Sequence, residues 1–167
     1  MLDTERFHLR ELTVEDVTDR YLEWLRGTAD YISVTAARPA RELSELRDYV
    51  RARIGRDDVL FLGIFDRSTG LHVGNIKFEP VDSARQFAVM GILIGDHDYR
   101  GKGVAAEVLA ATSVWLRDNR GINQIALGVS VKNPGAIHAY QKVGFELVDT
   151  PLITKSHPDQ VTMVLRL

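Results

Sequence analysis

The 167-residue sequence contains no cysteine, so disulfide bonds, thiolate nucleophiles and cysteine-ligated metals are excluded. An excess of charge is also lacking: 21 Lys and Arg stand against 23 Asp and Glu, and the formal net charge of -2 gives no bulk attraction to nucleic acid or to an anionic membrane. No uninterrupted apolar run is long enough to span a bilayer, and the opening MLDTERFHLR has no apolar stretch of signal-peptide length. We therefore expect a cytoplasmic protein with no nucleic-acid partner and no membrane partner.

Histidine is present but scattered. The five histidines have no pairwise ligand spacing, and neighbours in the cluster Asp96-His97-Asp98 point in different directions if this stretch is extended, so we expect no metal site. With 45% hydrophobic residues, the chain is long enough to bury one substantial core but has little room for two. Residues 1–167 are therefore expected to form one domain.

Hydrophobic periodicity divides the chain into strand and helix patterns. Period-two alternation or short apolar runs predict strands over 7–12, 59–65, 71–79, 87–94, 125–131, 145–148 and 160–167. Apolar residues three and four apart predict helices over 15–26, 43–54, 104–117 and 134–142, and the segment 31–39 is expected to be irregular. Short turns make 59–94 an antiparallel meander, whereas the helix over 104–117 joins two strands that should be parallel. The pattern predicts a mixed α+β fold.

A glycine turn, Arg100-Gly101-Lys102-Gly103, lies between the strand over 87–94 and the helix over 104–117. Glycines at such a turn allow positive φ angles and let the backbone approach a ligand closely, because no Cβ is in the way. The first N–H groups of the following helix lack intrahelical acceptors and carry the positive end of its dipole. The turn is therefore typical of a binding site for the phosphates of a nucleotide-bearing cofactor.

Two common phosphate-binding patterns match this turn poorly. The nucleoside-triphosphate loop needs a Ser or Thr directly after its Gly-Lys pair, but here Gly103 follows Lys102. Residues 101–106 do satisfy the relaxed dinucleotide fingerprint that ends in alanine, yet Ser130 stands near the place of its acidic residue. A single crossover unit late in a short chain also argues against a nicotinamide cofactor.

A second motif downstream makes the pattern more specific. Together with the first, it resembles the GNAT N-acetyltransferase superfamily, whose motif positions are matched by Arg100, Gly103 and Ala105 and later by Asn133, Ala136, Tyr140, Gly144 and Phe145. The text GILIGDHDYRGKGVAAE is similar to the ribosomal-protein N-acetyltransferase (RimJ/RimL-like) branch, which also includes polyamine and nucleotide-amino-sugar acetyltransferases. The segments LRELTVEDVTDRYLEWL and GNIKFEP resemble this branch too, so the resemblance covers nearly the whole chain.

The resemblance implies a GNAT-type fold: a mixed, mostly antiparallel central sheet with helices on both faces and one parallel, splayed strand pair. It implies acetyl-CoA as co-substrate, with the pyrophosphate on the turn amides and the pantetheine arm paired with the open strand. The implied cofactor-binding residues are Ile92, Leu93, Ile94, Arg100, Gly101, Lys102, Gly103, Val104, Ala105 and Asn133.

The resemblance also implies catalytic residues. Tyr140 matches the superfamily's tyrosine acid, which is expected to protonate the departing thiolate. Asn133 is expected to hydrogen-bond the cofactor or an ordered water, or simply to cap a helix. A neutral amine is needed for attack, yet many branch members carry a base, Glu, where this chain has Val89. Remaining base candidates are Glu79, His97, Asp98 and His138; Ser130 could position a water, and Glu107 is expected to be structural.

The sequence thus predicts direct acetyl transfer from acetyl-CoA to a primary amine, since no cysteine could carry an acyl-enzyme. The acceptor is left open among a protein N-terminus, a polyamine or other small amine, and a nucleotide amino sugar. The connection between the first two helices is a candidate acceptor-binding wall, and a homodimer is a compatible assembly. The alternative function is a non-catalytic acyl-CoA-binding or sensing module on the same scaffold.

Overall fold

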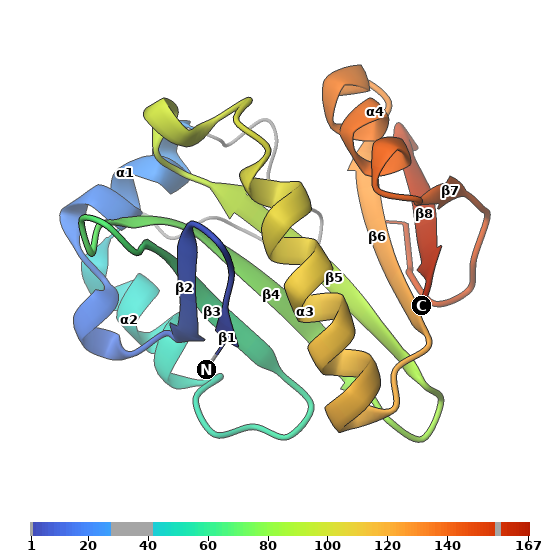
Figure 1. Ribbon diagram of the computed structural model, residues 1–167, viewed down its shortest axis with the longest axis horizontal. Coiled ribbons are helices and arrows are strands. Elements are labelled where there is room, and N and C mark those ends of the chain that lie inside the picture. The colour runs from blue at the N-terminus through green and yellow to red at the C-terminus, as the bar shows by residue number, and fades with distance from the viewer. Residues whose placement is uncertain (1, 28–41, 156–157) are drawn as a thin grey trace.

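The strands build one eight-stranded sheet in the order β1-β2-β3-β4-β5-β6-β8-β7 (Figure 1). The computed structural model describes residues 2–27, 42–155 and 158–167, so the expected irregular segment 31–39 lies outside the described residues. The strands are β1 Leu2–Asp3, β2 Phe7–Glu11, β3 Leu60–Asp66, β4 His72–Asp82, β5 Phe87–Ile94, β6 Gln124–Ser130, β7 Glu146–Leu147 and β8 Gln160–Arg166. The helices are η1 Val14–Asp16, α1 Asp19–Gly27, α2 Leu43–Arg51, η2 His97–Tyr99, α3 Val104–Arg120 and α4 Pro134–Lys142.

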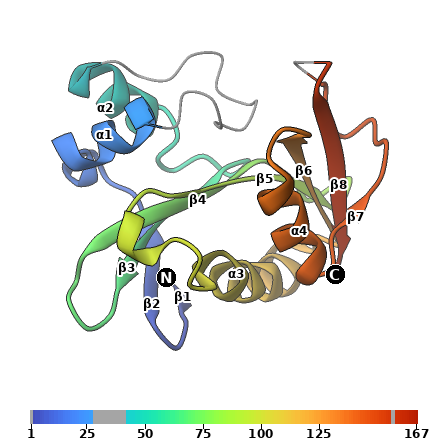
Figure 2. The same ribbon diagram turned by 90° about the horizontal axis from the view of Figure 1, so that it is seen from above.

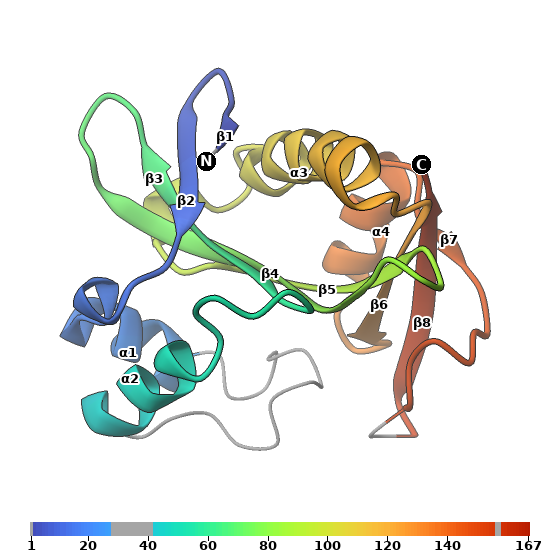
Figure 3. The same ribbon diagram turned by 90° about the horizontal axis from the view of Figure 1, so that it is seen from below.

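Helices cover both faces of this sheet. Figures 2 and 3 show α1 and α2 on one face and α3 and α4 on the other. The face under α3 holds the larger core, in which Ile76 and Met90 of the sheet pack with Val108 and Leu116 of the helix. On the opposite face a smaller core forms around α1 and α2. The predicted mixed α+β fold, mostly antiparallel and covered on both sides, is confirmed.

The sheet divides at β5 and β6, which are parallel neighbours. Their register pairs run only from Phe87 with Gln124 to Val89 with Ala126. Beyond that point residues 90–94 and 127–130 have no partner in each other, and Figure 1 shows the two ribbons diverging. Because β6 pairs with β8 as far as Ser130, the divergence opens only on the side that faces β5. The expected parallel, splayed pair is therefore present.

Helix α3 lies along this divergence and is delimited by two glycines. Its N-cap is Gly103 (φ 76°) and its C-cap is Gly121 (φ 65°), and both φ angles lie in the left-handed region. The Gly121 and Ile122 amides donate to carbonyls of the last turn, at Arg117 (3.2 Å) and Leu116 (3.3 Å), which ends the helix as expected for a C-terminal glycine. Among the described helices, none has the length and apolar character to cross a membrane.

The predicted helix over 15–26 is wrong in its first part. Asp16 accepts hydrogen bonds from the Thr13 amide (2.8 Å) and from two nitrogens of Arg10 (2.6 and 2.7 Å). These contacts hold residues 14–16 as a short 3₁₀ turn, after which Val17 is extended (φ -80°, ψ 93°) and α1 begins at Asp19. Two smaller differences are the two-residue strand β1, which was not predicted, and α2, which ends at Arg51 before the predicted boundary at 54.

Candidate functional site

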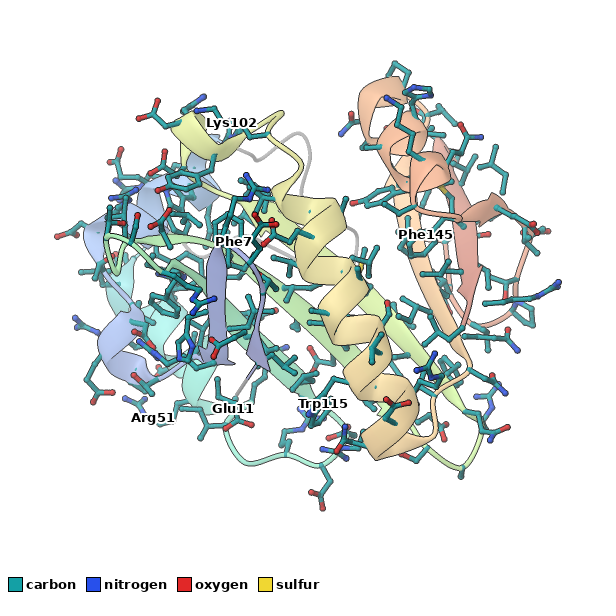
Figure 4. All side chains as sticks on the ribbon, viewed as in Figure 1. Phe7, Glu11, Arg51, Lys102, Trp115 and Phe145 are labelled. Atoms are coloured by element: carbon teal, nitrogen blue, oxygen red, sulfur yellow. The ribbon has the colours of Figure 1, made fainter. Side chains whose placement is uncertain are left out.

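The glycine turn after β5 has the backbone that the sequence predicted. Gly101 has φ 69° and Gly103 has φ 76°, a region in which residues with a Cβ are strained. No atom lies within 4 Å of the position that a Cβ on Gly101 would occupy, so the loop is open on that side. Figure 4 shows Lys102 beside the start of α3 and Phe145 beside α4, across the divergence of β5 and β6.

The amides of this loop are free to bind a ligand. Within the part of the chain that the structure describes, the N–H groups from Gly101 to Ala105 have no acceptor among backbone or side-chain atoms. The Arg100 amide differs, because it donates to His97 O (3.2 Å) and closes η2. Five of the six predicted phosphate-binding amides are therefore available, and they stand at the positive end of the 17-residue helix α3.

The Arg100 guanidinium binds backbone carbonyls and does not extend into the glycine loop as a phosphate ligand would. Its Nε donates to Ile94 O (2.9 Å) and its Nη2 to Gly95 O (3.0 Å), so the guanidinium holds the end of β5. Lys102 lies on the exposed turn. The positive charge beside the loop is thus present, but the Arg100 fork is already used by backbone carbonyls.

Alternate peptide groups of β5 face the divergence. The Gly95 amide donates to Val73 O on β4 (3.0 Å), and because peptide groups alternate along a strand, those of Leu93 also face β4. Ile92 and Ile94 consequently present their peptide groups to the open side, toward β6. Ile94 O accepts from Arg100, which leaves Ile92 with a donor and an acceptor for an extended ligand.

The loop after β5 and the helix after β6 lie at the same end of the divergence. In a parallel pair the carboxyl ends share one edge, and ligands in open α/β sheets bind outside these ends. Ser130 ends β6, and Asn133 then caps α4 with its Oδ1, which accepts from the Ala136 amide (3.1 Å). Asn133 is therefore a helix cap whose side-chain amide nitrogen remains a possible donor. Ser130 Oγ accepts from the Lys132 amide (3.2 Å).

Tyr140 lies on α4 and packs against Phe145, with ring centroids 5.7 Å apart. Burial raises the pKa of Tyr140 above its ordinary value of 10.0, so the phenol stays protonated at neutral pH. A cysteine-like thiol has a pKa of about 8.5, so complete proton transfer from this phenol to a thiolate would be uphill. The role that this pKa supports is hydrogen-bond donation to developing negative charge.

Glu79, one of the four candidate bases, is held in a network of cations. Lys77 Nζ (2.8 Å) and Arg53 Nε (2.9 Å) donate to its Oε2, and Arg56 Nη1 is 3.4 Å from Oε1. Lys77 also donates to Tyr49 Oη (2.6 Å). Burial acts to raise the pKa of Glu79, but the hydrogen bonds and charges of Lys77 and Arg53 outweigh it, so the pKa lies below its ordinary value. Such a carboxylate is a poor proton acceptor.

The other candidate bases are exposed. His97 and Asp98 lie on η2, and His138 lies on α4 with its side chain in solvent. Val89, where the branch commonly has Glu, is buried at the last register pair before the divergence. The structure therefore assigns no general base among these residues. The β5 position where the divergence from β6 begins carries the apolar side chain of Val89.

One residue at the site was missed from the sequence. Arg6, in the turn between β1 and β2, donates through its backbone amide and its Nε to Glu107 (2.8 and 2.7 Å) and through Nη2 to Lys102 O (3.0 Å). Glu107 thus binds Arg6, and its expected structural role stays a prediction. No local sequence signal indicates its partner, which lies 101 residues earlier.

The fold and this loop together give a parallel strand pair that splays, with a glycine loop and a helix N-terminus at its carboxyl end. Residues 6–146 match the family described as acetyltransferase (GNAT) domain. The chain therefore belongs to the GNAT acetyltransferase family and is an N-acetyltransferase by that membership.

Solved structures with the same fold include spermidine N-acetyltransferase SpeG from Vibrio cholerae. A variant of SpeG is 22% identical, with a TM-score of 0.75 and coverage of 95% of this chain and 94% of that chain. A dodecameric SpeG structure is 20% identical, with a TM-score of 0.75 and coverage of 96% and 94%. A chimera of SpeG and hSSAT is 19% identical, with a TM-score of 0.77 and coverage of 97% and 96%. At these identities the likeness establishes the fold alone.

Proposed function

We propose that the chain uses acetyl-CoA as co-substrate and transfers the acetyl group directly to a primary amine. The observation that carries this proposal is the row of amides from Gly101 to Ala105, which have no acceptor among the described residues. They follow the carboxyl end of β5, beyond Val89, the last residue of this strand that pairs with β6. Unpaired backbone donors at a helix N-terminus suit a diphosphate, because they supply hydrogen bonds and a favourable dipole together.

The open edge of β5 suits the remainder of the same ligand. Ile92 presents a peptide N–H and C=O toward the divergence, and an extended pantetheine arm carries amides that can pair with them as a strand would. Of the predicted pantetheine contacts at Ile92, Leu93 and Ile94, we therefore keep Ile92 and Ile94, because the peptide groups of Leu93 face β4. In this arrangement the diphosphate anchors one end of the donor, and the strand edge sets the direction of its thioester.

Tyr140 and the amine supply the chemistry in this proposal. The acetyl donor provides an activated thioester, and the neutral phenol of Tyr140 donates a hydrogen bond to charge that develops on sulfur. Among the described residues, the last β5 position that pairs with β6 carries Val89 and not a carboxylate, so the amine proton leaves to water or to an exposed group. Acceptors whose amine is partly neutral at neutral pH, such as an α-amine with a pKa of about 8, meet this condition most easily.

The acceptor is a small or peptide amine. The solved structures compared above are spermidine N-acetyltransferases, which makes spermidine the first acceptor to test. The cluster around Glu79 holds three cations, Lys77, Arg53 and Arg56, and two carboxylates, because Arg56 pairs with Asp58 as well as with Glu79. One positive charge is left over, which favours a less cationic acceptor. N-terminal peptides, as in the RimJ/RimL-like branch, and a nucleotide amino sugar therefore belong in the same screen.

The first experiment measures binding and turnover separately. Calorimetry at neutral pH with coenzyme A tests the donor site, and acetyl-CoA with spermidine, an N-terminal peptide or an amino sugar tests transfer by thiol release. We expect heat of binding with coenzyme A and acceptor-dependent release. Absence of binding contradicts the proposal, and binding without release for every acceptor favours the alternative of an acyl-CoA-sensing module.

Tyr140→Phe tests the catalytic assignment against a matched tyrosine. We expect kcat to fall about a hundredfold, with Kd for coenzyme A unchanged, because the ring is kept and only the donor is lost. Tyr99→Phe is the control, since the Tyr99 hydroxyl donates to Asp66 Oδ2 (2.8 Å), outside the catalytic assignment. Equal kcat values for the two variants would show that Tyr140 is not a catalytic residue.

A further inference from the structure

Arg6 joins three parts of the molecule that are distant in sequence. Its backbone amide donates to Glu107 Oε1 (2.8 Å) and its Nε to Glu107 Oε2 (2.7 Å), on the first turn of α3. Its Nη2 donates to Lys102 O (3.0 Å), inside the glycine loop. The β1–β2 turn is thereby attached to both the loop and the helix that follows it.

The bond to Lys102 O determines the direction of a loop amide. In a planar trans peptide the C=O and the N–H point in opposite directions, so the N–H of Gly103 points away from Arg6. The next peptide is also held, because Gly103 O accepts from the Glu107 amide (3.1 Å). Both peptides of the residue with φ 76° are thus oriented before any ligand binds.

The geometry of Arg6 is itself held from two sides. Arg6 O accepts from the Arg67 amide (2.9 Å), which fixes the backbone, and Glu107 fixes the guanidinium. The side chains of Arg6 and Glu107 are 43% and 20% exposed, so the ion pair adds little to stability. Arg6 also balances the carboxylate of Glu107, which would otherwise repel an anion at the N-terminus of α3.

We propose that Arg6, held by Glu107, is a positioning residue that aims the Gly103 amide at the diphosphate of the acetyl donor. This inference rests on the proposed function, because it requires that the loop bind coenzyme A. Arg6 acts through the loop backbone and is not required to touch the ligand.

The test compares two arginines that contact the same N-terminal segment. Arg6→Ala is expected to raise Kd for coenzyme A and KM for acetyl-CoA about fivefold to tenfold, the value of a lost charge-assisted hydrogen bond, with kcat unchanged. Arg67→Ala is the control: Arg67 Nη1 donates to Thr4 O (2.9 Å) in that segment, and the substitution keeps the Arg67 amide that holds Arg6. Equal Kd values for Arg6→Ala, Arg67→Ala and the unmodified chain, with folding verified by circular dichroism, overturn the inference.

Arg6→Lys and dephospho-coenzyme A separate positioning from charge. Lysine keeps the charge but lacks the planar guanidinium that bonds Glu107 and Lys102 O at the same time, so the affinity for coenzyme A should stay reduced. The effect of Arg6→Ala should be equal for coenzyme A and dephospho-coenzyme A, which share the diphosphate. Full recovery in Arg6→Lys, or an effect confined to coenzyme A, overturns the inference in favour of bulk charge or a direct 3′-phosphate contact.

Glu107→Gln provides a second variant in which Arg6 is present. We expect weaker binding of coenzyme A by about threefold, because Gln keeps only one acceptor oxygen for the two Arg6 donors, and no additional loss in the double variant with Arg6→Ala. Tighter binding in Glu107→Gln would mean that the carboxylate acts only by repulsion and would overturn the inference. If the unmodified chain does not bind coenzyme A, the proposed function fails, whereas binding that is indifferent to Arg6 and Glu107 refutes only this inference.

Discussion

The glycine loop before α3 and the cluster around Glu79 are both rich in polar groups, but they use them in opposite ways. In the loop, the amides from Gly101 to Ala105 have no acceptors among the described residues. In the cluster, the carboxylate of Glu79 is paired with Lys77, Arg53 and Arg56. Polar groups that satisfy one another stabilise a fold, whereas open donors on a fixed backbone are ready for a ligand. The comparison supports the proposals that the loop binds a ligand and that the cluster stabilises the fold.

The largest expected effect comes from breaking the cluster. Glu79→Gln removes the carboxylate that binds Lys77 and Arg53, whereas Arg56 keeps its pair with Asp58. We expect the free energy of unfolding to fall by about 2 kcal/mol, with kcat unchanged. Chemical denaturation measures the first quantity and thiol release the second. Glu146→Gln, an exposed carboxylate on β7, serves as the control. A large loss of kcat at unchanged stability would instead identify Glu79 as the base.

Gly103→Val tests the other side of the comparison. A β-branched residue is strained at φ 76°, so we expect a stability loss of about 1–2 kcal/mol and coenzyme A affinity at least about tenfold weaker. Gly70→Val is matched, because Gly70 has φ 72° and no atom within 4 Å of its Cβ position. Both variants should lose similar stability, and only Gly103→Val should lose affinity by calorimetry. Equal affinities would remove the loop from the donor site.

Arg100→Ala asks to which region this residue belongs. Its side chain donates to Ile94 O and Gly95 O, so we expect a stability loss of about 1 kcal/mol and a smaller change in coenzyme A affinity than in Gly103→Val. Thermal unfolding and calorimetry on the same variant measure the two effects. An affinity loss larger than that of Gly103→Val would show that the guanidinium leaves the strand and binds phosphate directly.

The smallest effect concerns acid stability on the face that carries α1. His72 stacks on Phe65 (4.7 Å) and hydrogen-bonds Asn75 Oδ1 (2.8 Å); burial lowers its pKa below 6.5, and the weaker opposing effects of Asn75 and Asp16 do not restore it. Below pH 6.5 the unfolded chain therefore binds a proton that the folded chain does not, so the free energy of unfolding decreases as the pH is lowered. We expect the melting temperature to fall between about pH 7 and pH 5.5, and to fall less in His72→Phe. An unchanged slope in that variant would assign the effect to other groups.

Much of the fold was predictable because it depends on local periodicity. Alternation, helical spacing and the glycines at 101, 103 and 121 indicated the element order and the parallel crossover. The boundaries that failed depend on contacts between elements. The helix predicted from 15 was interrupted because Asp16 binds Arg10 of the preceding strand, and no helical pattern contains that pair.

The candidate site was predictable to the same extent. The loop, Asn133 and Tyr140 follow from motif and resemblance, and their roles as ligands stay predictions. Two facts required coordinates: Arg100 is folded back onto β5, and Arg6 reaches Lys102 O from 96 residues away. A side chain with several possible partners has no preferred one until the strands fix the distances.

The short register between β5 and β6 also has a mechanical consequence. Three residue pairs connect the block of β6, β8, β7 and α4 to the other five strands, whereas seven pairs connect β6 to β8. We expect this short ladder to bend more easily than the ladder between β6 and β8, so that a small rotation there changes the separation of β5 and β6. A ligand that contacts both β5 and the block of β6, β8, β7 and α4 should therefore reduce this rotation. Amide hydrogen exchange in β6 should then slow when coenzyme A is added.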